Sequence, residues 1–463
     1  MSAEANRIEI DAVDFQISCR RFTIRASVTN DRQLPVVDEF VLRLLAVLER
    51  VQVTRLRAWF GFSKSEIQTV LLDMGRNKYV EFDGDEVMLA PAGRELFRTA
   101  GDGGAPHIVE VTPLVETVWF DLVSRNMVPR SRTPNTDYLV RLAEQPNARE
   151  FPEAFARHAF EENFRDYAKR IRRFPEPDKV NLYSISDVEG GSYGYQLLPA
   201  GLVLDTDRMM VRTTFSELGD DAAAFQKLTV AANDAWQSAY SPEATPATAA
   251  EFERMTGRGD LASLIHSPAE AEGWIQAITM LGREEGGFTG TIGASYMASN
   301  LARLVDRIAT SDHNSDELEI TWLRPSGSTW GRTLRVAEAL HQVRAAARNA
   351  GRSELRTVQA MPRSTHRTVR SQHRRLFERG YLLPQGHLPA NLEVLLVPGI
   401  GALVNVHLRL GRHSVPVGGL VTDPKRLARM AERLAPSAVA GWDEAWRASI
   451  QNGVAVASSS RRT

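Results

Sequence analysis

The stretch SKSEIQTVLLDMGRNKYVEFDGDEVML, residues 63–89, carries the clearest folding signal in the chain. Ser63 is followed three residues later by Glu66, the spacing of a capping box, in which each side chain satisfies a free backbone N–H at a helix start. Apolar residues then recur at helical spacing, and we expect the helix to turn four of them inward: Ile67, Val70, Leu71 and Met74. Apolar runs on either side of Asp83-Gly84-Asp85 predict a hairpin of two short strands.

The residues before this stretch predict two more helices, Val36 to Arg50 and Val53 to Phe60. The first follows Pro35, and its apolar positions form one stripe: Val37, Phe40, Val41, Leu44, Leu45 and Leu48. This order of elements resembles bacterial winged helix-turn-helix domains, and KYVEFDGDEVMLAPAGRELF (78–97) resembles their wing and the helix after it. The resemblance covers residues 36–98, so we assign residues 33–100 to one winged helix-turn-helix domain.

The resemblance implies that the third helix lies in the major groove of DNA, with polar side chains on base edges. The candidate DNA-binding residues on that helix are Lys64, Gln68, Thr69 and Arg76. The alternative is a protein-contact domain, which the acidic wing favours: residues 36–98 hold nine basic and ten acidic residues. We favour DNA, because the outward positions of the third helix are polar, whereas a protein interface usually has an apolar centre.

The rest of the chain predicts a multidomain α/β protein. Residues 1–32 alternate apolar and polar side chains, which is typical of short half-buried strands. Residues 101–250 mix helices and strands and end in a Pro/Ala/Thr-rich linker, Tyr240 to Glu251. Helices and strands alternate over 251–447, as in an α/β domain, and 448–463 read as a loose tail.

Two runs near the C-terminus, LEVLLVPGIGALVNVHLRL (392–410) and VPVGGLVTDPKRL (415–427), resemble the second half of the phospholipase D superfamily. The resemblance implies an α/β sandwich whose catalysis needs a pair of His-x-Lys motifs. This chain has no His-x-Lys: Val404-Asn405-Val406 stands at the expected place. A shifted register gives His407-Leu408-Arg409, with Ser414 where the family has an aspartate. We therefore expect a degenerate, inactive phospholipase-D-like domain over 251–447.

A concentration of arginines lies in the same domain. Residues 344–379 hold ten arginines against two acidic residues, although the whole chain has a net charge of −1. Four are spaced to line one face of a helix predicted over Ser364 to Arg379, with His366 and His373 beside them: Arg363, Arg367, Arg370 and Arg374. Arg344 and Arg348 begin a second row on a helix predicted over Trp330 to Asn349. The sequence predicts a phosphate-binding surface, the alternative being an ordinary solvated one.

Other chemistry lacks its sequence signals. Cys19 is the only cysteine, there is no P-loop or metal motif, and no run is apolar enough to span a membrane. Gly190-Gly191-Ser192-Tyr193-Gly194 matches Gly-x-Ser-x-Gly, but its surroundings predict a hairpin turn and not a nucleophile elbow. We therefore expect no catalytic residues, no cofactor and a reduced, cytoplasmic location.

These observations favour a non-enzymatic nucleic-acid-binding protein, with DNA as its partner. Such domain combinations resemble components of bacterial phage-defence (antiviral) or DNA-processing systems, in which a partner protein supplies ATPase or nuclease activity. The first alternative is a transcriptional regulator with a ligand-sensing C-terminal domain, bound to a palindromic operator as a homodimer. The second is an active nuclease or phosphodiesterase whose catalytic groups are dispersed in the sequence.

Overall fold

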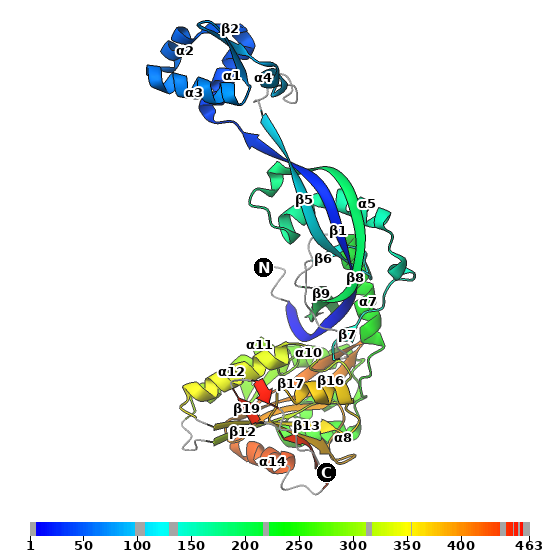
Figure 1. Ribbon diagram of the computed structural model, residues 1–463. Coiled ribbons are helices and arrows are strands. Elements are labelled where there is room, and N and C mark those ends of the chain that lie inside the picture. Colours follow the sequence, from blue (N-terminus) through cyan, green and yellow to red (C-terminus); the bar gives the residue numbers. More distant parts are fainter. Residues whose placement is uncertain are drawn as a thin grey trace.

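The computed structural model describes residues 6–97, 107–128, 138–215, 222–311, 317–352, 354–435, 441–447, 449–451 and 454–456. It shows a multidomain mixed α/β chain with three parts (Figure 1). A small distal domain (residues 34–97) lies at one end, a long twisted sheet that we call the arm lies in the middle, and an α/β domain (residues 246–447) lies at the other end.

The distal domain contains α1 (Val36–Leu48), α2 (Val53–Phe60), α3 (Lys64–Arg76) and α4 (Pro91–Glu95). A three-stranded sheet of order β2-β4-β3 joins β2 (Arg50–Gln52), β4 (Glu86–Leu89) and β3 (Val80–Asp83). The capping box predicted at Ser63 and Glu66 is confirmed. The stripe predicted on α1 is partly wrong: Leu42 is buried, whereas Phe40 and Leu48 are exposed, because α1 turns a narrower face, rotated toward Leu42, onto the core.

The arm is built on β1 (Arg7–Gln33), a strand of 27 residues. It pairs antiparallel with β5 (His107–Asp121) on one side and with β8 (Val180–Asp205) on the other, and β9 (Met210–Phe215) pairs with β8. Two short strands, β6 (Met127–Val128) and β7 (Val140–Arg141), complete the sheet. The distal domain is inserted between β1 and β5, at the tip of the pair they form (Figure 1).

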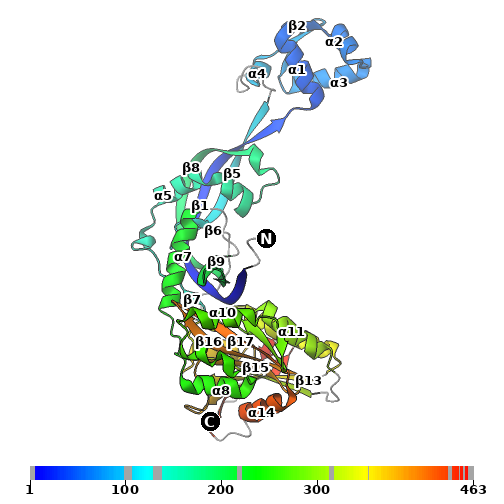
Figure 2. The ribbon, with the colours of Figure 1, turned by 180° about the vertical axis from the view of Figure 1, so that it is seen from behind.

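Helices cover the arm along its length. The segments η1 (Ala148–Glu150), α5 (Glu153–Glu162), α6 (Phe164–Asp166), η2 (Tyr167–Ile171) and η3 (Pro177–Lys179) follow one another in the chain. Phe22, Phe120 and Phe151 are buried together under them, with ring centroids 5.4–5.7 Å apart. The longer α7 (Ala222–Gln237) lies beside the other end of the arm (Figure 2), where Trp236 packs edge-on against Phe15.

The α/β domain is a nine-stranded sheet of order β10-β11-β17-β16-β15-β12-β13-β14-β18. Its strands are β10 (Glu284–Glu285), β11 (Phe288–Ile292), β12 (Glu317–Leu323), β13 (Glu354–Pro362), β14 (Arg379–Leu383), β15 (Leu392–Val397), β16 (Gly401–Leu410), β17 (His413–Val421) and β18 (Asp443–Arg447). Strands β12, β13 and β14 run parallel, and the other pairs are antiparallel.

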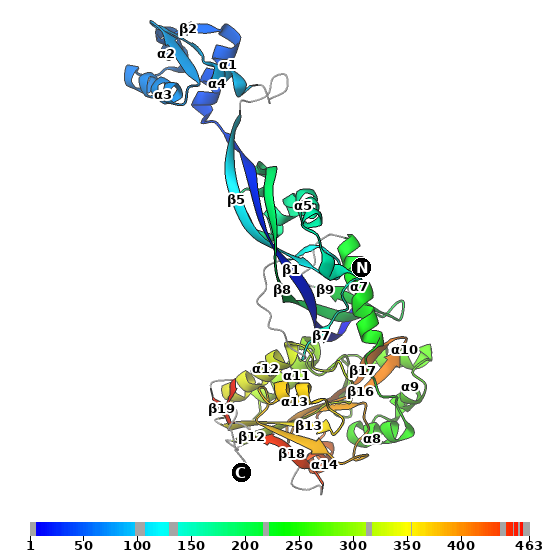
Figure 3. The ribbon, with the colours of Figure 1, turned by 45° about the vertical axis from the view of Figure 1, so that its right-hand side comes forward.

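Helices cover both faces of this sheet (Figure 3). One face packs against α8 (Pro246–Thr256), η4 (Gly259–Leu261), α9 (Ala262–His266), α10 (Ala271–Thr279) and α14 (Pro424–Leu434). The other packs against α11 (Ala298–Ala309) and α12 (Arg335–Asn349), and α13 (Arg367–His373) lies between β13 and β14 in the chain. Strand β15 sends Val394 and Leu396 to the first face and Leu395 and Val397 to the second, which explains why it is apolar at every position except Glu393.

Three sequence predictions about organisation are wrong. Residues 1–32 do not form a separate set of short strands, because β1 is one strand whose partners come from residues 107–205. Gly190–Gly194 is not a turn: it lies inside β8, where a Cβ at Gly194 would come within 2.7 Å of the Trp119 ring, so the glycine makes room for that ring. The predicted linker contains the start of α8, which Thr245 and Thr248 fix by a second capping box.

The predicted tail, 448–463, lies mostly outside the described residues, but Ser449–Gln451 (β19) and Val454–Val456 (β20) pair as strands.

Within the described ranges, no helix has both the length and the apolar character that a membrane crossing requires.

Candidate functional site

The predicted DNA-binding residues lie on the surface of the distal domain. Lys64, Gln68, Thr69 and Arg76 are all exposed on α3. The Thr69 hydroxyl donates to the Ser65 carbonyl (3.0 Å), and Arg76 is 3.4 Å from Asp73. The capped helix start therefore leaves Lys64 and Gln68 as the polar side chains best placed to reach another molecule.

The surface around α3 is less polar than the sequence predicts. Leu72 on α3 is 58% exposed, and Trp59 and Phe82 are exposed nearby in the chain, on α2 and β3. The expectation of a purely polar outer face is therefore wrong. The hairpin of β3 and β4 is acidic as predicted, and Arg50 lies 3.4 Å from Asp83.

The predicted arginine stripe does not form as one helical face. Helix α13 covers only Arg367–His373, so Arg363 precedes it and Arg374 is its C-cap residue. The helix ends early because the Phe377 side chain is buried in the core and β14 begins at Arg379. Arg367 is exposed and Arg370 is half-buried. Arg363 is exposed but ion-paired with Asp443 (2.5 Å).

The second predicted row of arginines, on α12, also fails to form one exposed surface. Arg348 is exposed on α12, whereas Arg344 is half-buried and donates to the Leu376 carbonyl (2.8 Å). Burial lowers the pKa of Arg344 below the ordinary arginine value. His373 is fully buried, with its Nδ1 hydrogen-bonded to Gln359, and its pKa is held well below the usual histidine value by that burial. Arg348 and Arg367 are thus the exposed members of the predicted set without an ion pair among the contacts the structure describes.

The structure brings together a second set of polar residues, on the α11/α12 face of the central sheet. Glu393 on β15, Asn405 and His407 on β16, and Ser414 on β17 follow the two-residue period of their strands and lie on one face. Glu393 and Asn405 are fully buried and His407 is 5% exposed. Burying several polar groups lowers the stability of the fold unless each one is hydrogen-bonded. Their hydrogen bonds therefore show how the fold tolerates this cluster.

Each of these buried groups has a partner. His407 Nε2 lies 2.9 Å from a Glu393 carboxylate oxygen, and the Ser414 hydroxyl lies 3.4 Å from His407 Nδ1. Glu393 also accepts from the Ser295 backbone N–H (3.2 Å) and from the Trp322 indole N–H (3.4 Å). Asn405 donates to the Ser295 hydroxyl (3.1 Å). The network holds the imidazole between an acid and a hydroxyl.

Strand β1 of the arm adds a further carboxyl group to this cluster. Asp11 is 4% exposed and accepts hydrogen bonds from the Tyr296 hydroxyl and from the Ala12 backbone N–H (2.7 Å). Burial raises the pKa of Asp11 to about 6, and the hydrogen bond from Tyr296 opposes that rise. The pKa of Asp11 therefore lies closer to neutral pH than that of an ordinary aspartate.

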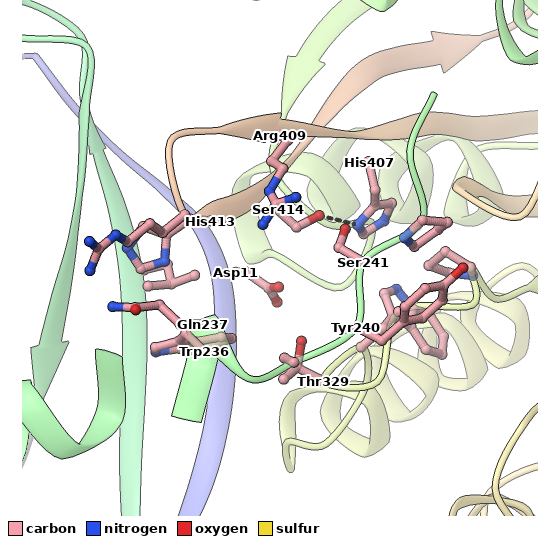
Figure 4. Close-up of a pocket in the computed structure, with 17 residues that line it drawn as sticks. Asp11, Trp236, Gln237, Tyr240, Ser241, Thr329, His407, Arg409, His413 and Ser414 are labelled. Carbon is pink, nitrogen blue, oxygen red and sulfur yellow. Dashed lines mark hydrogen bonds between the residues drawn. The ribbon is translucent and has the colours of Figure 1, made fainter. Parts of the chain in front are cut away.

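A cavity of about 220 Å³ opens beside this cluster, between the arm and the α/β domain. Figure 4 shows the Ser414 hydroxyl directed at the His407 ring, with the Asp11 carboxylate, Trp236 and Thr329 around the same space. The segment Tyr240–Pro242, part of the predicted linker, forms one wall and is tied down by a hydrogen bond from Tyr240 N to Ser328 Oγ (3.0 Å).

Several polar atoms at this cavity have no partner among the residues that the structure describes. They are the indole nitrogens of Trp236 and Trp330 and Nδ1 of His413, and all three side chains line the cavity. Unsatisfied buried polar atoms are rare in folded proteins. All three atoms are buried from solvent, so a molecule in the cavity would reach them only if their side chains moved.

The pKa of Asp11 gives a prediction about stability. A carboxyl group whose pKa is higher in the folded state stabilises the fold below pH 4, and that contribution is lost as the pH rises through 6. Asp11→Asn keeps an acceptor for Tyr296 but does not titrate. We expect the variant to gain stability relative to the natural protein between pH 4 and pH 7, by about 2–3 kcal/mol at about 1.4 kcal/mol per pKa unit. Urea unfolding at both pH values measures this, and a pH-independent difference would contradict it.

Three residues of this site stand out in the sequence alone. His407, Arg409 and Ser414 lie in a frame that resembles His-x-Lys but lacks the lysine. The available signal was the regular placing of polar residues at every second position of otherwise apolar strands, as in Asn405-Val406-His407-Leu408-Arg409. Asp11 and Glu393 carry no such signal together, because they come from different sheets and only the fold brings β1 against β17 of the α/β domain.

In comparisons with known proteins, no family model, no curated protein and no solved structure matches the chain. Within the described ranges, no group of three or more His, Cys, Asp or Glu residues is arranged to hold a metal ion.

Proposed function

We propose that the distal domain is a winged helix that contacts DNA, and that the chain is a nucleic-acid-binding protein. The observation that supports this most directly is the order α1-β2-α2-α3-β3-β4, with Lys64 and Gln68 exposed on the capped helix α3. A helix of this kind presents polar side chains from its first turns to base edges in the major groove.

The position of the domain supports the same proposal. The distal domain lies at the far end of β1 and β5, away from the α/β domain (Figure 1). A duplex can therefore approach α3 without meeting the rest of the chain. The acidic hairpin of β3 and β4 opposes this approach, so we propose contact through α3 and not through the hairpin.

The α/β domain supplies a second part of the proposal. We propose a degenerate phospholipase-D-like domain that lacks the His-x-Lys pair and holds phosphate through its exposed arginines, Arg348 and Arg367. In a defence or DNA-processing system, a partner protein would then supply the ATPase or nuclease activity.

The test is a gel-shift series on duplexes that footprinting selects from genomic fragments. We expect Lys64→Glu with Gln68→Ala to weaken binding about 10- to 1,000-fold and to remove sequence preference, because a good base contact contributes about 1–3 kcal/mol of discrimination. Asp83→Lys should tighten binding at low salt, since it removes an acidic side chain from the hairpin beside α3.

Lys425→Glu on α14 is the matched control, because it makes the same charge change on an exposed lysine of the α/β domain. It should leave sequence preference unchanged. If the α3 double variant and the control bind every duplex with the affinity of the natural protein, the distal domain is a protein-contact module. Protection of one palindromic site by a dimer would favour the transcriptional regulator.

A further inference from the structure

We propose that Ser414, His407 and Glu393 form a second functional site, which hydrolyses small carboxylic esters through an acyl intermediate on Ser414. The arrangement is that of a nucleophile beside a base, with the base oriented by a third group. It uses none of the residues of the proposed DNA contact.

The sheet itself fixes the three side chains. Ser414 is the register partner of Arg409, and His407 and Arg409 alternate with apolar residues on β16, so Ser414 and His407 lie on one face of adjacent strands. Glu393 on β15 pairs with Asn405, two residues before His407, and completes the row. Groups placed on neighbouring strands of a central sheet are held more precisely than groups on loops.

The hydrogen bonds fix the tautomer of His407. Glu393 accepts from Nε2, so the ring proton lies on Nε2 and the lone pair of Nδ1 faces the Ser414 hydroxyl. The distance of 3.4 Å from Ser414 Oγ to Nδ1 is long, but such contacts in unliganded sites commonly shorten when substrate binds. His407 is thereby prepared to accept a proton from Ser414.

Glu393 acts as a positioning residue. It is buried and does not line the cavity, and its oxygens accept from the Ser295 N–H and the Trp322 indole as well as from His407. A carboxylate held by three donors keeps the imidazole in one orientation. Ser414 and His407, by contrast, both line the cavity and can touch a substrate.

The cavity indicates the class of substrate. Its volume of about 220 Å³ is below the range of roughly 300–1,000 Å³ that is typical of pockets for larger ligands, so the acyl group must be small. Trp236 and Trp330 provide apolar walls. Arg409 and Arg412 line the cavity and are exposed, which favours an ester with an anionic group.

The reaction needs only the ester and water. Ser414 Oγ bonds to the acyl carbon while its proton moves to His407 Nδ1, and the carbonyl π pair moves onto oxygen. The intermediate collapses, the bond to the alcohol oxygen breaks, and the alcohol leaves with the proton from Nδ1. Water then attacks the acyl carbon and gives a proton to Nδ1. The bond between the acyl carbon and Ser414 Oγ breaks, Oγ takes the proton from Nδ1, and the carboxylic acid leaves.

A fluorophosphonate probe tests the nucleophile on the full-length protein. We expect covalent labelling at Ser414, located by peptide mass spectrometry, together with hydrolysis of p-nitrophenyl acetate. Ser414→Ala should abolish both, and His407→Gln should lower them about 10²- to 10⁴-fold. Ser184→Ala, an exposed serine of the arm, is the matched control and should change neither. Labelling of another serine, such as the cavity-lining Ser241, would overturn the proposal, as would no labelling.

Two further variants separate chemistry from folding. Ser414→Cys should react with iodoacetamide faster than a free surface thiol, because His407 accepts its proton, and Cys19 is buried and does not compete. Glu393→Gln should lower kcat about 10²-fold or more with little change in KM, as expected of a residue that acts through His407. An unreactive cysteine, or a Glu393→Gln variant that changes KM alone, would contradict the assigned roles.

Discussion

Gly418→Ala should lower the free energy of unfolding of the α/β domain by about 3 kcal/mol or more. Most single substitutions cost less, and a loss of this size is expected where the added atom forces the backbone to move. Gly418 is the register partner of Asn405 in the centre of the sheet. A Cβ at this position would lie 1.8 Å from the Val404 carbonyl oxygen and 2.7 Å from Asn405 Oδ1. Neither β16 nor β17 can shift without disturbing the buried row that contains His407. Urea unfolding followed by tryptophan fluorescence measures the loss.

Gly411→Ala is the matched control for Gly418→Ala. Gly411 lies at the tip of the same β16–β17 hairpin, where nothing stands within 4 Å of an added Cβ, but its φ of +60° disfavours alanine. We expect a loss of about 1–2 kcal/mol from this backbone strain alone. A loss at Gly418 no larger than the loss at Gly411 would contradict the prediction, because it would mean that the two strands make room for the added Cβ at little cost.

Phe22→Ala should destabilise the arm by about 3–5 kcal/mol, the usual cost of removing a fully buried phenylalanine ring. The Phe22 ring is edge-on to Phe120 (5.7 Å between centroids) and tilted against Phe151 (5.4 Å), so its loss leaves a cavity between the sheet and its covering helices. Hydrogen exchange of the β1 and β5 backbone amides is the measurement, because it reports on the arm separately from the α/β domain.

The control for Phe22→Ala is Val115→Ala, on β5 of the same arm. Val115 is 62% exposed, so its truncation removes little buried surface and should change protection by less than about 0.5 kcal/mol. Faster exchange at β1 in both variants to the same extent would contradict the packing described for Phe22.

Local elements of the fold could be predicted from the sequence, because their signals lie within a few residues. The Ser63–Glu66 capping box and helix α2 are present as predicted. The arm could not be predicted, since irregularities such as Arg20–Phe22 break the two-residue period of β1 into short pieces, and its partner β8 is distant in the chain. Pairing over such separations depends on the whole fold and leaves little trace in a local pattern.

The candidate site residues also differ in how far the sequence predicts them. Exposure of Lys64 and Gln68 follows from helical period alone and agrees with the structure. The arginine stripe assumed that one helix continues from 364 to 379, and it failed where the chain leaves the helix after His373. The pairing of His407 with Glu393 depends on the β15–β16 register, which strand sequences of nearly continuous apolar character do not specify.

The length of the arm sets the distance between the distal domain and the α/β domain. Strands β1 and β5 pair over fifteen positions, from Cys19 opposite Asp121 to Gln33 opposite His107. At about 3.4 Å per residue this length is about 50 Å. The same distance along B-form DNA corresponds to about 15 base pairs. On one duplex, the proposed contacts of α3 and of the α/β domain would thus be more than a helical turn apart, with the separation set by the number of residues in a strand and not by the DNA sequence.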